Sequence, residues 1–403
     1  MIEQISNPHR IATDLAAIVG SAHVSIVGDT VAVVPENTEQ VSSVLRFCNR
    51  AGFSVSAVGG GTKQRWGTPI QSKIILHTRR LNGLLEHTWQ DMTCTVQAGC
   101  TWSALQNSLA QHGQFVALDP LWPDRATVGG ITATNDSGAL RLKYGSLRDL
   151  IIGMTIVLAD GTIARTGGKV VKNVAGYDLH KLMIGAFGTL GLITEITFRL
   201  HSLPVHLKSF TIISPAAEPL GSLLLQLLDS HLNVQSMQLR TIGDVFGLDV
   251  QLSALPEVLK DQTILLSAIA HKAELSIEEA CAELWDNRVL SFTGSDVFTM
   301  KATMLPSDIA RFTRIIHDLG GTAVTQATGI MTASLPVTLE HQLPQLRQQF
   351  IDAQGSFTIL QQPASTDVDL WGPMPDSFSL MQRIKQHFDP NRTLNPGRFM
   401  GGI

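Results

Sequence analysis

Three consecutive glycines, Gly59-Gly60-Gly61, place the strongest constraint on what this chain can fold into. Residues 54–58 (SVSAV) before them have the pattern of a short buried strand. Glycine lets the backbone take positive φ and lets ligand oxygen atoms approach N–H groups that a Cβ would shield. A nucleotide pyrophosphate is the natural ligand of such a loop, although a simple flexible turn explains the run equally well when the run is considered alone.

A Rossmann dinucleotide-binding unit requires spaced glycines that open an amphipathic helix. Upstream, a strand at 31–34 (VAVV) and a helix capped by Thr38 and ending at Gly52 resemble the start of such a unit. The glycines, however, continue into TKQRWGTPI, which includes Pro69 and has no helical periodicity. The loop must therefore hold a phosphate without a following helix.

Two later segments are rich in small and hydroxyl residues. Residues 120–145 read PLWPDRATVGGITATNDSGALRLKYG, and residues 167–200 read GGKVVKNVAGYDLHKLMIGAFGTLGLITEITFRL. Small side chains let a flat ligand lie against the backbone. The first segment alone is better explained as an ordinary loop, and the Gly-Thr-Leu-Gly turn of the second precedes a strand.

The mixture of elements predicts an α+β chain with two domains, the boundary lying at about residue 204. We expect a first domain at 1–204, a smaller second domain at 205–387, and a segment at 388–403 that returns toward the first domain. In the first domain we also expect strands at 73–77 and 93–97 and a helix capped by Thr101. Beyond the boundary we expect strands at 207–213, 235–241, 247–252, 263–270 and 329–335, and helices at 219–230, 274–287, 309–319, 339–353 and 376–387.

Charge and composition exclude several classes of protein. The formal net charge of -4 offers no basic field for nucleic acid. No run approaches the ~20 apolar residues of a membrane span, and residues 1–10 lack the apolar core of a signal peptide. We expect a cytoplasmic protein with no transmembrane segment, and association with the inner face of the membrane only through partners.

The spacing of the cysteines and histidines does not indicate a metal site built on a single helix, strand or loop. The four cysteines include no Cys-x-x-Cys pair, which argues against an iron–sulfur cluster, a zinc knuckle or a disulfide framework in this chain. The thirteen histidines never lie two, three or four residues apart. We therefore predict no metal, although ligands brought together from distant segments stay open.

The joint order of GGGTK, ATVGGITATNDSG, KNVAGYDLHKL and FGTLGLITE resembles the FAD-binding domain of the vanillyl-alcohol oxidase and p-cresol methylhydroxylase (PCMH) superfamily, over residues 20–204. Within it, the lysine after the glycines, the KNVAGYDL block, the short second domain and the closing LNPGRF look most like the FAD-binding E subunits of bacterial glycolate oxidase. The resemblance implies a two-subdomain PCMH-type FAD-binding domain followed by a smaller α+β cap domain with a mainly antiparallel sheet.

The same resemblance implies roles for individual residues. It implies a pyrophosphate loop, a wall along the flavin and phosphates, and a turn at the adenosine end. Covalent relatives attach the flavin through a histidine at the glycine loop or a partner side chain, and residues 57–67 contain neither histidine nor cysteine. We therefore expect noncovalent FAD. The three sets are Val58, Gly59, Gly60, Gly61, Thr62 and Lys63; Thr127, Gly129, Gly130, Thr134, Asn135 and Ser137; and Gly188, Thr189, Leu190, Gly191 and Ile193.

The KNVAGYDL block holds Lys172, Asn173, Tyr177 and Asp178. Tyrosine and lysine can both move protons, so these residues could form an acid/base set. A packed, hydrogen-bonded turn near the cofactor is the better interpretation. The catalytic residues therefore stay unassigned.

The second domain departs from the pattern of the related 2-hydroxy-acid dehydrogenases. These carry a His-x-Gly-Asp-Gly-Asn-x-His type metal motif there, and nothing between 205 and 403 matches it. The resemblance therefore implies an FAD-binding subunit that relays electrons or stabilises a catalytic flavin subunit, alongside an iron–sulfur subunit, in the oxidation of glycolate to glyoxylate. Two alternatives stay open: a self-sufficient FAD-dependent dehydrogenase of another hydroxy acid or alcohol, and a flavin-fold assembly scaffold.

Overall fold

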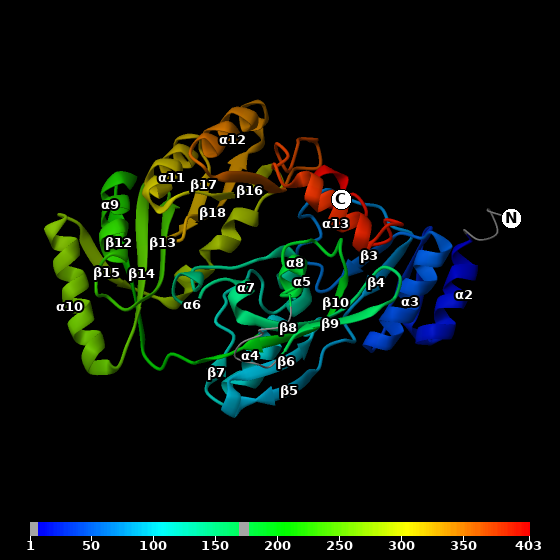
Figure 1. Ribbon diagram of the computed structural model, residues 1–403. Coiled ribbons are helices and arrows are strands. Elements are labelled where there is room, and N and C mark those ends of the chain that lie inside the picture. Colours follow the sequence, from blue (N-terminus) through cyan, green and yellow to red (C-terminus); the bar gives the residue numbers. More distant parts are fainter. Residues whose placement is uncertain (1–6, 169–176) are drawn as a thin grey trace. The chain divides into compact units, whose positions relative to one another are not determined.

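The computed structural model describes residues 7–168 and 177–403, which fall into two compact units (Figure 1). The first unit takes the described parts of residues 1–136, 146–202 and 373–403, and the second takes residues 137–145 and 203–372. The boundary expected near residue 204 lies next to the point where the second unit resumes. Each unit buries hydrophobic clusters of its own.

A four-stranded mixed sheet with strand order β1-β2-β4-β3 begins the first unit. Strand β1 is antiparallel to β2, whereas β4 is parallel to both β2 and β3. Helix α3 is capped by Asn37 and not by Thr38 as expected, because Asn37 is extended and its side chain accepts a hydrogen bond from Gln40 N. The elements are α2 (Pro8–Val19), η1 (Ser21–His23), β1 (Val24–Val27), β2 (Thr30–Val33), α3 (Thr38–Ala51), β3 (Val55–Val58) and β4 (Ile74–His77).

A five-stranded antiparallel sheet with strand order β5-β6-β10-β8-β9 completes the first unit. Its central strand β10 buries Ile196 and Phe198 completely. The elements are β5 (Leu84–Thr88), η2 (Trp89–Asp91), β6 (Thr93–Gln97), α4 (Trp102–Ala110), β7 (Gln114–Phe115), α5 (Val128–Thr134), α7 (Leu147–Leu150), β8 (Ile151–Val157), β9 (Ile163–Gly167), α8 (His180–Met183), β10 (Leu192–Arg199), β11 (His201–Ser202), α13 (Phe378–Phe388) and η6 (Met400–Gly402).

The C-terminal segment after α13 adds itself to the four-stranded sheet. Val55 N donates to Thr393 O at 2.7 Å, and Asn395 N donates to Val55 O at 2.9 Å. Leu394 forms a parallel bridge with Val55 and is fully buried. Backbone hydrogen bonds therefore hold this segment beside the strand that leads into the glycine run.

The second unit is built on an eight-stranded sheet with strand order β15-β12-β14-β13-β17-β18-β16-β19, in which every pair of neighbours is antiparallel. Alternate residues of a strand face opposite sides, so Phe210 joins the apolar core while Thr211 faces a polar layer. The elements are α6 (Arg141–Tyr144), β12 (Leu207–Ser214), α9 (Ala217–Leu228), β13 (Val234–Ile242), β14 (Val245–Ser253), α10 (Pro256–Lys272), β15 (Ser276–Ala280), η3 (Ala282–Phe292), β16 (Val297–Thr303), η4 (Pro306–Asp308), α11 (Ile309–Asp318), β17 (Thr322–Gln326), β18 (Ile330–Pro336), η5 (Val337–Gln342), α12 (Leu343–Asp352) and β19 (Ser356–Gln361).

Two expectations for the second unit are wrong. Residues 263–270, expected as a strand, lie inside helix α10, where Leu259, Leu266 and Ala270 are buried at helical spacing. Residues 274–287, expected as a helix, contain the edge strand β15 and the start of η3. A short apolar run does not by itself distinguish a buried helix from a strand, and an exposed edge strand can carry helix-like polar residues.

None of the helices in residues 7–168 and 177–403 combines the length with the apolar sequence that crossing a bilayer requires.

Candidate functional site

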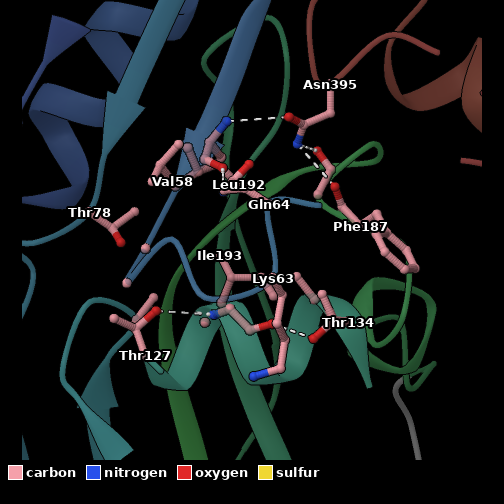
Figure 2. A pocket seen from close by; sticks show the side chains of 18 of the residues that line it. Val58, Lys63, Gln64, Thr78, Thr127, Thr134, Phe187, Leu192, Ile193 and Asn395 are labelled. Carbon is pink, nitrogen blue, oxygen red and sulfur yellow. Dashed lines mark hydrogen bonds between the residues drawn. The ribbon is translucent and has the colours of Figure 1, made fainter. Parts of the chain in front are cut away.

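A pocket in the first unit gathers the glycine run, helix α5, the segment before β10 and the C-terminal segment (Figure 2). Thirteen of the residues predicted from the sequence line it: Val58, Gly59, Gly60, Gly61, Thr62, Lys63, Thr127, Gly129, Gly130, Thr134, Gly188, Gly191 and Ile193. Nine lining residues were not predicted: Ala57, Gln64, Thr78, Ala98, Ala133, Phe187, Leu192, Asn395 and Arg398.

The glycine run forms one wall of the pocket. A Cβ on Gly60 would overlap the carbonyl of Arg125, and a Cβ on Gly59 would overlap the hydroxyl of Thr127, so both positions require glycine. Gly61 has a φ of 71° and open space around its Cα. Within the described part of the chain, the amides of Gly59, Gly60, Gly61 and Thr62 donate to no protein acceptor. Four successive residues that line the pocket therefore have backbone N–H groups not used by the described protein.

Lys63 follows these amides and lines the pocket, but its ammonium group is bonded by the protein. Lys63 Nζ lies 3.1 Å from Asp136 Oδ2 and 3.5 Å from the carbonyl O of Leu121. It also lies 5.5 and 5.4 Å from the ring centroids of Trp66 and Trp122. The side chains of Lys63 and Asp136 are 4% and 1% exposed, so this is a buried ion pair.

Helix α5 supplies another wall of the pocket and begins next to the glycine run. Thr127 caps it by accepting a hydrogen bond from Gly130 N at 3.3 Å, and the Thr134 hydroxyl donates to Gly130 O at 2.8 Å. A Cβ on Gly129 would lie 2.8 Å from the Cβ of Ala98, so the helix can pack this closely on the end of β6 only with glycine there. Both hydroxyls therefore stabilise the helix at the pocket that these two residues line (Figure 2).

Four predicted site residues lie outside this lining. Asn135 ends α5 with a φ of 49°, and Thr189 donates its hydroxyl to Ala186 O at 2.7 Å. Leu190 is buried in the hydrophobic cluster of the five-stranded sheet. Ser137 belongs to the second unit, where its carbonyl accepts hydrogen bonds from Arg288 and Gln326.

The structure describes only residues 177–179 of the KNVAGYDL block. Lys172 and Asn173 lie outside the described residues. Tyr177 is 88% exposed, and Asp178 forms an ion pair with Lys181 at 2.6 Å.

Two pocket residues that were not assigned from the sequence come from the C-terminal segment. Asn395 contacts both the strand before the glycine run and the segment before β10. Arg398 is buried and donates to the carbonyl oxygens of Lys63, Gln64 and Trp66. Burial lowers the pKa of Arg398 to about 10. Both residues belong to LNPGRF, which the resemblance included as a motif without giving its residues a role.

The second unit holds a buried polar layer under η3. Asp249 is fully buried and accepts hydrogen bonds from the Thr211 hydroxyl at 2.9 Å, Gln238 Nε2 at 3.0 Å and Arg240 Nε at 2.7 Å. Three donors satisfy this carboxylate, so it stabilises a hydrogen-bonded network and is a poor candidate for a general base. Among residues 7–168 and 177–403, no three His, Cys, Asp or Glu side chains cluster as metal ligands.

Residues 30–167 match the family of FAD binding domains, and residues 374–399 match the C-terminal domain of FAD linked oxidases. The pocket residues 57–64, 78, 98, 127–134, 395 and 398 lie within these two matches. Most of the pocket therefore lies in the part that matches FAD binding domains, and Asn395 and Arg398 lie in the part that matches the C-terminal domain of FAD linked oxidases.

The chain is also similar to named oxidases and dehydrogenases over somewhat less than half of its length. Glycolate oxidase subunit GlcD of Bacillus subtilis is 38% identical over 173 residues, which are 43% of this chain and 37% of that protein. The mitochondrial D-lactate dehydrogenase (cytochrome) of Arabidopsis thaliana is 35% identical over 193 residues, 46% of this chain and 33% of that protein. The chain thus spans about a third of the length of the curated relatives it matches.

A solved structure of p-cresol methylhydroxylase with bound substrate has the same fold as this chain. Its TM-score is 0.75 at 16% identity, and the match covers 97% of this chain and 96% of that one. At this identity the likeness establishes the fold alone. The expected α+β class, with a PCMH-type FAD-binding fold and a large antiparallel sheet in the second part, is confirmed.

Proposed function

We propose that this chain is a noncovalent FAD-binding subunit of a complex that oxidises a 2-hydroxy acid, with glycolate as the substrate. FAD would lie in the pocket of the first unit, where it supplies two-electron redox chemistry. The chain would relay electrons or stabilise a catalytic flavin subunit, and an iron–sulfur subunit would carry electrons away. A cytoplasmic complex, attached to the membrane only through partners, is part of the same proposal.

One observation supports the FAD site above all others: Gly59, Gly60, Gly61 and Thr62 line one pocket, and their amides donate to no described protein acceptor. A hydrogen bond to a charged acceptor is worth about 1.5–3 kcal/mol, so several such amides can hold a pyrophosphate without a free cation. The match of residues 30–167 to FAD binding domains supports the same ligand.

The choice of a 2-hydroxy acid rests on the relatives. A glycolate oxidase subunit and a D-lactate dehydrogenase are both more than a third identical to this chain over the 43% and 46% of it that they match. Noncovalent binding rests on residues 57–67, which contain neither histidine nor cysteine. The role as a subunit rests on the second unit, in which no set of substrate-oxidising side chains was recognised and the buried carboxylate of Asp249 is already satisfied by three donors.

The test begins with the full chain purified under native conditions, alone and with whatever co-purifies. We expect about one FAD per chain, released into the supernatant by acid precipitation because no covalent bond holds it. We expect the co-purified complex, and not the isolated chain, to reduce an artificial dye with glycolate.

A variant of the glycine run connects flavin content to this pocket. Gly60→Ala should lose FAD because its Cβ would overlap the Arg125 carbonyl and displace the loop. Gly168→Ala is the matched control, since a Cβ there meets nothing within 4 Å. Equal FAD content in the two variants would exclude this pocket as the site.

The two alternatives predict different results. A self-sufficient dehydrogenase would reduce the dye as an isolated chain, with glycolate or another hydroxy acid or alcohol. A flavin-fold scaffold would purify colourless and still bind its partners.

A further inference from the structure

The side chain of Asn395 lies between two pocket loops that are distant in the sequence (Figure 2). Asn395 Nδ2 donates to the carbonyl O of Phe187 at 3.0 Å and of Gly188 at 3.1 Å. Its Oδ1 accepts from Ala57 N at 3.3 Å. One amide group therefore connects the end of β3, which leads into the glycine run, with the segment before β10.

The backbone on both sides of this contact is shaped to allow it. A Cβ on Gly188 would lie 2.7 Å from Asn395 Nδ2, so glycine at 188 is needed for the amide to approach. Phe187 and Asn395 themselves have positive φ values of 54° and 41°. Non-glycine residues with positive φ cost free energy and are concentrated at functional sites.

The side chain of Asn395 is not what keeps the C-terminal segment in place. Backbone hydrogen bonds pair Val55 with Thr393 and Asn395. Lys385 Nζ, in a buried ion pair with Asp389 at 2.6 Å, also donates to the carbonyl oxygens of Thr189 and Leu394. These contacts do not involve the side-chain amide of Asn395, so anchoring the C-terminal segment does not depend on that amide.

We infer that Asn395 is a positioning residue of the cofactor site, which fixes the distance between the glycine run and the segment before β10. The inference rests on the proposed binding of FAD, a dinucleotide long enough to contact both loops at once. Asn395 sets the distance between these two segments, which such a ligand must span. A substitution at this residue therefore weakens FAD binding more than it lowers the stability of the folded chain.

Two variants remove the connection in different ways. Asn395→Asp keeps the size and the acceptor for Ala57 N but replaces the donor with an oxygen that repels the carbonyls of Phe187 and Gly188. Asn395→Gly removes all three side-chain hydrogen bonds while easing the positive φ. Asn391→Asp is the matched control: it lies in the same segment, is exposed, and donates through Nδ2 to Asn49 at 3.0 Å.

The experiment measures the Kd for FAD of the flavin-free full chain by fluorescence titration, and the Tm of each chain with and without FAD. We expect the Kd of Asn395→Asp and Asn395→Gly to rise about 10-fold or more, since two or three hydrogen bonds are lost. The Tm of the flavin-free variants should stay within about 4 °C of the wild type, and the gain in Tm on adding FAD should shrink. Asn391→Asp should keep the wild-type Kd within about 2-fold.

Unchanged Kd values in both Asn395 variants overturn the inference. So does a large loss of Tm in the flavin-free variants with the FAD-induced gain intact, because that is the result of a purely structural residue. A wild-type chain that binds no FAD overturns the proposed function and this inference together, and the wild-type titration distinguishes that case from the others.

Discussion

Lys63 places a positive charge in the wall of the pocket. Its ammonium group, however, already forms an ion pair and a hydrogen bond within the protein. From the sequence Lys63 is expected to supply a positive charge near the pyrophosphate, because it lies two residues after the glycine run. In the structure its ammonium group contacts Asp136 and the carbonyl of Leu121, and two tryptophan rings lie within 5.5 Å of it. We therefore attribute phosphate binding to the backbone amides and treat Lys63 first as a residue that anchors the loop.

The substitution Lys63→Met tests this at the residue scale. It removes the ion pair between Lys63 and the buried Asp136, and breaking a buried pair from one side costs about 3–5 kcal/mol. We expect the free energy of unfolding of the flavin-free chain, measured by urea denaturation, to fall by about this amount.

The double variant Lys63→Met with Asp136→Asn separates the buried charge from the rest of the effect. It replaces the buried carboxylate with a neutral amide but keeps an acceptor for Leu121 N, which in the wild type donates to Asp136 Oδ2 at 2.8 Å. We expect it to recover part of the lost stability. A single variant as stable as the wild type would show that the pair does not anchor the loop.

At the scale of elements, the local sequence predicted those helices and strands in which the apolar periodicity and the capping or turn residues indicate the same structure. Helix α3 has an apolar face and a left-handed glycine at its end, and its bounds differ from the expected ones by about one residue. Part of helix α10 was predicted as a strand and the segment containing strand β15 as a helix. The apolar run in α10 is typical of a strand, and the polar residues of β15 are typical of a helix. Pairing with β12 decides that Ser276–Ala280 is a strand, and that information is not local.

The pocket residues also differ in whether a single segment of the sequence can indicate them. Glycine, threonine and lysine at 58–63 and 127–134 were predicted because consecutive small residues are visible in one segment. Asn395 and Arg398 were not assigned, because their contacts with residues 57–66 and 187–188 exist only after the chain has folded back. Asn-Pro-Gly reads as a turn, and a turn signal carries no information about its distant neighbours.

The stacked rings of Phe312 and Phe350 allow a test on the helices of the second unit. Phe312 on α11 and Phe350 on α12 are fully buried, with ring centroids 3.9 Å apart. Phe312→Ala should lower the free energy of unfolding of the second unit by about 3–5 kcal/mol, through lost burial and the cavity it leaves. The pocket lining contains only residues of the first unit, so FAD content should not change.

Leu225→Ala on α9 is the control, since Leu225 is part exposed and should cost less than about 1 kcal/mol. Urea denaturation and the flavin spectrum check both expectations. Loss of FAD in Phe312→Ala at temperatures where the second unit stays folded would contradict them.

At the scale of the whole molecule, the first unit contains the FAD-binding match and also three histidines that resist protonation. Burial lowers the pKa of His77, His180 and His201 below the ordinary 6.5. Neighbouring Arg79 and Arg199 lower the pKa of His77 and His201 further, while around His180 the charge of Asp178 opposes the effect of burial. All three histidines lie in the first unit.

The sign of the resulting pH dependence follows from which state binds protons. As pH falls through 6.5, a histidine in the unfolded chain takes up a proton, whereas these three stay neutral in the folded chain until a lower pH. The unfolded state therefore gains protons first, and the first unit loses stability as the pH falls from about 7 to about 5.5. Thermal unfolding of the chain across this range should show a falling Tm, and His180→Gln should flatten the slope because that side chain cannot be protonated. A slope that His180→Gln leaves unchanged, or a Tm that rises on acidification, would mean that burial of these rings does not control the acid stability of the FAD-binding unit.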